Sequence, residues 1–183
     1  MHVLAICGSL RAASSNGALL DAAVRLAPEG VRIERFGGIA ALPHFNPDLD
    51  VDPAPPPVAA WRRALRDADA IVVSSPEYVH GVPGALKNAL DWIVSSGEFS
   101  GKPLALIDTS RSNYGTPQLR EILTTMEARL VPSASITLPL WTNRVDADAI
   151  LAHERSAHAL RAAVAALVAS AREAAAASAA ATL

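Results

Sequence analysis

The sequence contains a single cysteine, Cys7, which excludes an internal disulfide and a zinc site built from several cysteines. Its five histidines do not compensate for this scarcity. The nearest pair, His153 and His158, misses the i, i+4 spacing that places two imidazole rings on one face of a helix. We therefore expect no metal site, and we expect Cys7 to be a buried strand residue.

Lysine and net positive charge are also scarce. Only two of the 16 basic residues are lysines, Lys87 and Lys102, and the formal net charge is -2. A protein that neutralises nucleic-acid phosphates needs a surplus of basic residues, and no basic tract supplies one here. With 183 residues, of which 51% are hydrophobic, the chain predicts one globular domain over 1–183 and no nucleic-acid partner.

Long uninterrupted hydrophobic runs are missing at both ends of the chain. The N-terminal apolar run, Val3 to Cys7, is too short for a secretory signal and lacks a basic segment before it. The C-terminal stretch is apolar, but Arg161, Arg172 and Glu173 interrupt it. These features predict a cytoplasmic protein without a membrane span.

Short apolar runs alternate with helix-like periodicity along the chain. The expected strands are residues 2–7, 31–36, 70–74, 104–107 and 135–138. The expected helices are residues 16–27, 57–66, 83–94, 117–130 and an Ala-rich helix from about 146 into a tail that frays. This alternation predicts an α/β fold, an open doubly wound parallel sheet covered by helices on both faces. The length favours a five-stranded flavodoxin-like sheet, order 2-1-3-4-5, over a barrel, which needs about 250 residues.

The loop after the first expected strand, residues 8–16 (GSLRAASSN), has the chemistry of an anion site. Ligands of such sheets bind outside the carboxyl ends of the strands, and the following helix offers unpaired amides there. The polar donors are Ser9, Arg11, Ser14, Ser15 and Asn16. The alternative is that this loop only caps the helix.

Three known phosphate loops do not fit this segment. It has no lysine for a Walker A loop, and a GxGxxG motif counted from Gly8 would need glycines at Leu10 and Ala13. A cysteine phosphatase loop would need an arginine six residues after Cys7, where Ala13 stands.

A second polar loop, residues 75–82 (SPEYVHGV), follows the strand expected at 70–74. Gly81 and Gly84 permit close backbone approach, and Tyr78 offers an apolar face suited to a planar ring. The alternative is a plain turn followed by an amphipathic helix. In that helix we expect Lys87 and Asp91 to form an exposed i, i+4 pair, and Trp92 to lie in the core or at a subunit contact. The connector 37–56 is long enough for a lid, or it is a surface loop held by its prolines and Phe45.

These segments resemble the NADPH-dependent FMN reductase family. PEYVHGVPGALKNALDW is similar to the family signature PEYxxSxPGxLKNAIDW, and GSLRAASSN is similar to its GSLRxxSxN loop. LPHFNPDLD and GKPLALIDTS also resemble family segments in the expected order, so the resemblance spans residues 3–115.

The resemblance implies bound FMN and the use of NADPH or NADH. By position, the residues that would hold the FMN phosphate are Ser9, Arg11, Ser14 and Asn16. Those that would border the flavin ring, mainly through backbone groups, are Pro76, Glu77, Tyr78 and Val79, and Ser110 belongs to the third loop. Two positions depart from the family pattern: Val79, where the family often has Asn, and Gly81, where it often has Ser.

The implied activity is an FMN-dependent NAD(P)H oxidoreductase that reduces a flavin, quinone, azo dye or chromate by a ping-pong mechanism. FMN carries this chemistry, so no catalytic residue is expected. For Glu77 a solvated or structural role is expected rather than proton transfer, and His80 is either an exposed loop residue or a proton donor to the acceptor. Selection of NADPH would fall to Arg111 or to an arginine of a second subunit, since a homodimer or homotetramer is implied. The rival functions are a non-enzymatic flavodoxin-type electron carrier and a flavin-binding protein without turnover.

Overall fold

A computed structural model describes residues 1–109, 113–140, 142 and 144–181 of the protein. In chain order the strands are β1 (His2–Cys7), β2 (Arg32–Arg35), β3 (Ala70–Ser74), β4 (Pro103–Asp108), β5 (Arg129–Leu130) and β6 (Ile136–Thr137). The α-helices are α1 (Ser15–Arg25), α2 (Pro56–Arg66), α3 (Gly84–Asp91), α4 (Gly115–Thr125), α5 (Ala147–Ala152) and α6 (Glu154–Ala181). Short 3-10 helices are η1 (Ile39–Ala41), η2 (Pro47–Leu49) and η3 (Pro132–Ala134).

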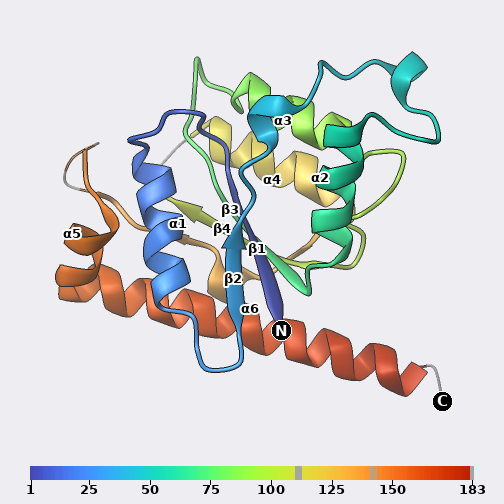
Figure 1. Cartoon of the computed structure of the whole chain (residues 1–183). Helices are drawn as coiled ribbons and strands as arrows, with labels where there is room; N and C mark the ends of the chain where they lie inside the picture. Colours follow the sequence, from blue (N-terminus) through green and yellow to red (C-terminus); the bar gives the residue numbers. More distant parts are fainter. Residues whose placement is uncertain (110–112, 141, 143, 182–183) are drawn as a thin grey trace.

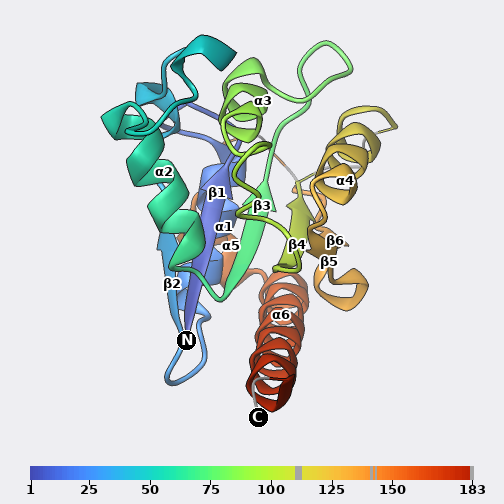
Figure 2. The ribbon, with the colours of Figure 1, turned by 90° about the vertical axis from the view of Figure 1, so that its right-hand side faces the viewer.

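The strands form one parallel sheet with the order β2-β1-β3-β4-β5, which confirms the predicted topology. Helices α1, α5 and α6 cover one face, and α2, α3 and α4 cover the other (Figures 1 and 2). The carboxyl ends of β1, β3 and β4 therefore lie side by side at one edge of the sheet.

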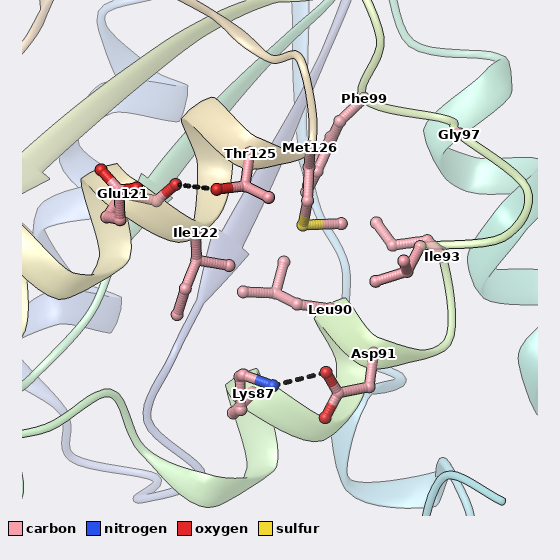
Figure 3. A pocket seen from close by; sticks show the side chains of 11 residues that line it. Lys87, Leu90, Asp91, Ile93, Gly97, Phe99, Glu121, Ile122, Thr125 and Met126 are labelled. Carbon is pink, nitrogen blue, oxygen red and sulfur yellow. Dashed lines mark hydrogen bonds and ion pairs between the residues drawn. The ribbon is translucent and has the colours of Figure 1, made fainter.

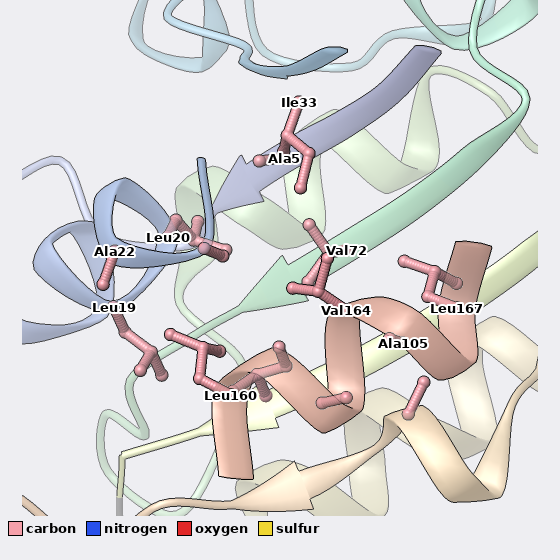
Figure 4. Packing of buried hydrophobic residues seen from close by; sticks show 14 of the residues in the cluster. Ala5, Leu19, Leu20, Ala22, Ile33, Val72, Ala105, Leu160, Val164 and Leu167 are labelled. Atoms are coloured by element: carbon pink, nitrogen blue, oxygen red, sulfur yellow. The ribbon is translucent and has the colours of Figure 1, made fainter. Parts of the chain in front are cut away.

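The two faces of the sheet differ in side-chain size. In β1, Leu4 and Ile6 point toward the face covered by α2 and α3, whereas Ala5 points toward the face covered by α1 and α6, because successive side chains of a strand alternate between faces. Alanines recur on the α6 side at Ala70 and Ala105. These small side chains let the long helix α6 lie close to the sheet, where Leu160, Val164 and Leu167 fill the remaining space (Figure 4).

Helix α6 is long and apolar enough to cross a membrane by length and composition alone. Its inner stripe, however, is buried against the sheet from Leu160 to Ala171, and the turns after Ala171 are largely exposed. Core packing thus accounts for the apolar stripe of α6 that faces the sheet. The expected single helix from residue 146 is broken at His153, whose Nδ1 accepts from the backbone N–H of Ser156 at 3.3 Å and bonds to the Ser156 hydroxyl at 2.8 Å.

The last third of the sheet departs from the expected elements. The helix expected to reach Leu130 ends at Thr125, because Glu127 adopts a left-handed φ of 59° and the N–H of Ala128 bonds back to the carbonyl of Leu123 at 3.0 Å. Arg129–Leu130 then forms β5, and β6 follows after η3, so two short strands share the fifth position. Between them Ser135 Oγ accepts from the N–H of Leu106 at 3.1 Å and replaces a missing rung of the ladder.

The long connector between β2 and α2 is tied to α3. Asn88 accepts from the N–H of Phe45 at 2.8 Å and donates to the carbonyl of Pro43 at 2.9 Å. The Trp92 indole also donates to Pro43, at 2.8 Å, and packs edge-on against Phe45. These contacts favour a fixed surface loop over a lid, and they place Trp92 in the core.

Candidate functional site

The first and second loops cross at Gly8, directly after β1. The Gly8 N–H donates to the carbonyl of Ser74 at 2.9 Å, and a Cβ on Gly8 would lie 2.3 Å from Ser75 Oγ and 2.8 Å from Ser75 Cβ. Only glycine allows the two backbones to approach this closely. The first loop therefore runs directly over the end of β3.

The first loop ends in a helix cap. Ser14 has an extended backbone, and its Oγ accepts from the N–H of Gly17 at 3.3 Å, so the capping alternative is right for this residue. The first turn of α1 has no acidic residue, which leaves its positive end without a carboxylate. Arg11 is exposed, and Ser9 and Ser15 are half-buried beside it.

Asn16 plays a structural part at this edge. Its side chain is buried, and its Oδ1 accepts from the hydroxyl of Ser74 at 2.9 Å. This hydrogen bond ties the first turn of α1 to the end of β3. Cys7 is buried as expected, with its Sγ 4.0 Å from Ser14 Oγ.

The second loop is a tight hairpin. Tyr78 and Gly81 exchange two backbone hydrogen bonds of 3.0 Å, and the two residues between them have φ values of 50° (Val79) and 59° (His80). Both φ values lie in the left-handed region, as a type I′ turn requires. A β-branched residue is rarely found there, so Val79 is strained, and its side chain is 102% exposed.

Helix α4 holds this hairpin in place. Glu77 Oε2 accepts from the N–H of Gly115 at 2.8 Å, so a residue of the second loop caps the start of α4. Gln118 Oε1 accepts from the N–H of Val82 at 2.8 Å. The rings of His80 and Tyr114 stack with centroids 4.1 Å apart and planes 17° apart. Of the two roles expected for Glu77, these contacts support the structural one, and they fix the second loop to the start of α4.

Gly115, Gln118 and Tyr114 are the residues that sequence reasoning missed. Each acts across more than 30 positions of the chain, so no local spacing signals its role. The need for glycine at position 115, where a Cβ would lie 3.0 Å from Glu77 Cγ, is visible only in the structure.

Asp108, the last residue of β4, is the buried carboxyl group of this edge. Burial raises its pKa, against the lowering effects of a hydrogen bond to Thr116 and of the nearby charge of Arg120. It lines a small cavity of about 20 Å³ together with Ser75, Pro76, Glu77 and Gly115. A cavity of this size with polar walls holds about one water molecule.

The predicted residues of the third loop, Ser110 and Arg111, lie outside the described residues. Apolar side chains stand exposed around the rest of this edge: Leu10 on the first loop, Tyr78 and Val79 on the second, and Tyr114 before α4. The edge thus combines a cationic, amide-rich corner at the first loop with an apolar rim at the second. Among the residues described, no group of three or more metal-ligating side chains gathers here or elsewhere.

Comparison of the whole chain with known proteins shows similarity to flavin-dependent oxidoreductases. A family model described as NADPH-dependent FMN reductase matches residues 1–143. An NAD(P)H-dependent FMN reductase of Pseudomonas aeruginosa is 35% identical over 85% of this chain and 87% of its own, and a quinone reductase of Escherichia coli is 30% identical over 80% and 81%. The solved structure of a flavoenzyme NAD(P)H:(acceptor) oxidoreductase from Paracoccus denitrificans superposes with a TM-score of 0.81 at 29% identity, covering 94% of this chain and 97% of that one.

Val79→Asn should raise the free energy of unfolding by about 1 kcal/mol, because asparagine tolerates the left-handed backbone and no buried contact is lost. Urea unfolding of the variant and the wild type measures the difference. Val51→Asn, at an exposed valine without a positive φ, is the matched control and should show no gain. An equal gain in both variants would mean that polarity, rather than backbone strain, is responsible.

Asp108→Asn should stabilise the protein at neutral pH. Because the pKa of Asp108 is raised on folding, the stability that its neutral form contributes is complete below about pH 4 and is lost as pH rises through the folded-state pKa. The variant keeps a neutral group at every pH, so its advantage in Tm should grow from pH 4 upward. Thermal unfolding between pH 4 and 8 checks this, with the exposed Asp52→Asn as control; a pH-independent difference would contradict it.

Proposed function

The chain belongs to the NADPH-dependent FMN reductase family, and from that membership we propose that its three carboxyl-edge loops hold FMN and present it to a quinone. Its activity is that of an FMN-dependent NAD(P)H oxidoreductase. The observation that supports the site assignment is the pairing of a cationic loop with an apolar rim at one edge of the sheet. The acting unit is the single domain formed by residues 1–183.

The first loop fits a phosphate group. Gly8 lets the loop backbone pass over β3, the first turn of α1 lacks a carboxylate, and Arg11 is exposed beside its amides. In this proposal Ser9, Ser15 and Arg11 donate hydrogen bonds directly, whereas Ser14 and Asn16 shape the loop. Arginine offers a planar fork of donors that matches phosphate oxygens.

The second loop fits a planar ring. The hairpin from Pro76 to Gly81 is fixed by α4, so its backbone groups are already oriented toward the carboxyl edge. FMN, when bound, supplies the hydride- and electron-transfer chemistry. The protein's part is to hold the ring, to limit water around it through Tyr78 and Tyr114, and to leave one face open. NAD(P)H and the acceptor would use that face in turn, which gives ping-pong kinetics.

A quinone suits this rim better than a charged protein acceptor. Leu10, Tyr78, Val79 and Tyr114 expose apolar surface where an acceptor would approach. Electron carriers dock on their partners through surfaces of complementary charge, and a net charge of -2 provides little charge for such docking. The relatives named quinone reductases support the same choice of acceptor. The single buried cysteine, with no disulfide, supports a cytoplasmic location.

The decisive experiment is to reconstitute the purified protein with FMN and to follow NADPH and NADH oxidation with a benzoquinone as acceptor. We expect sustained turnover that requires both FMN and the quinone. A long-lived one-electron form of the flavin without steady NAD(P)H oxidation would support an electron carrier instead. Protein that binds FMN but shows neither behaviour would be a flavin-binding protein.

Arg11→Ala should weaken FMN binding by about 1.5–3 kcal/mol, the range for a hydrogen bond to a charged group. Riboflavin lacks the phosphate, so its affinity should stay unchanged. Fluorescence titration of the apoprotein measures both ligands, and Arg63→Ala, at an exposed arginine of α2, controls for the loss of one charge. Equal weakening of FMN and riboflavin binding would show that Arg11 does not bind the phosphate.

We further propose that a second copy of the chain covers the groove between α3 and α4. This groove has a volume of about 280 Å³, and Leu90, Ile93, Ile122 and Met126 point into it (Figure 3). Lys87 lies on its α3 side and Glu121 on its α4 side, so a twofold axis that sets α3 of one copy against α4 of the other would bring these opposite charges together. The predicted Lys87–Asp91 pair is present at 2.5 Å and borders the groove.

Val94→Asp should therefore shift the protein toward the monomer, because it places a charge on the exposed, apolar rim of the groove. Sedimentation velocity of the variant against the wild type tests this. Leu49→Asp, at an exposed apolar residue of the connector, should leave self-association unchanged. A wild type that sediments as a fully active monomer would refute the proposed dimer.

A further inference from the structure

A cavity of about 450 Å³ lies beside the first loop. Its walls come from residues 11–14, from α1 and from the segment 144–147 that leads into α5. Arg11 lines it from the loop, and Arg144 lines it from a part of the chain more than 130 residues away. The two arginines thus share one cavity although no sequence pattern links them.

The acidic groups in this cavity are already engaged. Asp21 binds the guanidinium of Arg35 at 2.8 Å, and Asp146 accepts from the N–H of Ala149 at 2.8 Å as the cap of α5. Among the described residues, neither Arg11 nor Arg144 forms an ion pair with a carboxylate. Asp146 keeps its negative charge as a helix cap, so the cavity holds two guanidinium groups and one carboxylate that, in the described part of the chain, pairs with neither of them.

Arg35 lies close to the first turn of α1, and its charge is balanced by Asp21. A Cβ on Gly17 would lie 3.3 Å from the Arg35 guanidinium, so this group lies against the first turn of α1. That turn has no acidic residue of its own. Arg11, Arg144 and the N-terminal end of α1 face the same cavity, which favours an anion with more than one charge.

Arg144 is held at this cavity by its neighbours in the chain. Val145 is buried in the core, and Asp146 caps α5. Helix α5 is in turn joined to α1 by the Arg25–Asp148 ion pair at 2.6 Å. The backbone of Arg144 is thus fixed relative to α1 and the first loop.

We propose that this cavity binds a phosphate monoester and that Arg144 is its second binding arginine, opposite Arg11. The proposal rests on the proposed function, since FMN and NADPH each carry one phosphate monoester, on the ribityl chain and on the adenosine ribose respectively. Arg144 lies just outside residues 1–143, the part matched by the family model, so its role does not follow from that match. Two planar guanidinium groups can each bind two oxygens of such a dianion.

The test compares Arg144→Gln with the wild type and with Arg161→Gln, which removes the same charge from an exposed position on α6. One arm titrates the apoproteins with FMN and with riboflavin by fluorescence. The other arm measures the KM for NADPH and for NADH in the reconstituted enzymes. We expect Arg144→Gln to weaken the binding of FMN and not of riboflavin about tenfold, or to raise the KM for NADPH and not for NADH about tenfold. The arm in which this occurs identifies the source of the phosphate.

Equal effects on FMN and riboflavin, or on NADPH and NADH, would indicate a merely structural role and would overturn the proposal. The proposal would also be overturned if Arg144→Gln had no effect in either arm, or if Arg161→Gln had the same effect. If the wild type binds FMN and oxidises NADPH while Arg144→Gln matches it throughout, this inference fails and the proposed function stands. If the wild type binds neither compound, the proposed function fails first, and the phosphate site fails with it.

Discussion

The close approach of two backbones at Gly8 is the constraint on which the carboxyl edge depends. A side chain at this position would overlap Ser75, so the first loop can cross the end of β3 only because residue 8 has none. The crossing brings α1 within reach of β3, where Asn16 and Ser74 form a buried hydrogen bond. It also directs the first loop away from the sheet and leaves Arg11 exposed beside the first turn of α1. The location of the cationic corner is therefore a consequence of one missing Cβ.

The second loop shows the opposite situation, in which an unfavourable local conformation is maintained by distant contacts. Val79 and His80 both have positive φ, and neither is a glycine. Glu77, His80 and Val82 each contact the start of α4, so unfolding the hairpin would also expose the cap of that helix. Strain of this kind persists only where the surrounding structure over-determines it. The arrangement keeps an apolar tip in water at the place where an acceptor would approach.

Much of the sheet could be predicted from the sequence, because buried parallel strands are continuous apolar runs; the boundaries of β1 and β3 are those expected. The end of α4 could not, since its left-handed residue is Glu127 rather than a glycine. At the site, neither the left-handed turn at Val79 and His80 nor the contacts of Gln118 and Tyr114 could be predicted, because all of them depend on how α4 packs. Asn88 and Trp92 belong to the motif that carries the family resemblance, yet they bind the connector through Pro43. A motif therefore locates a site more reliably than it assigns each of its residues to that site.

The scarcity of lysine has a physical counterpart in how cations are distributed. Lys87 pairs with Asp91, and Lys102 donates to the carbonyls of Leu65 and Ala68 at 2.5 and 2.7 Å, where it satisfies the end of α2. Burial lowers the pKa of Lys102, against the raising effect of the nearby charges of Asp69, Glu98 and Asp67. With both lysines engaged in the fold, anion binding is left to arginine. A guanidinium keeps its charge at any physiological pH and offers paired donors in one plane. A loop with arginine in place of lysine therefore still offers a positive charge and well-oriented donors to a phosphate.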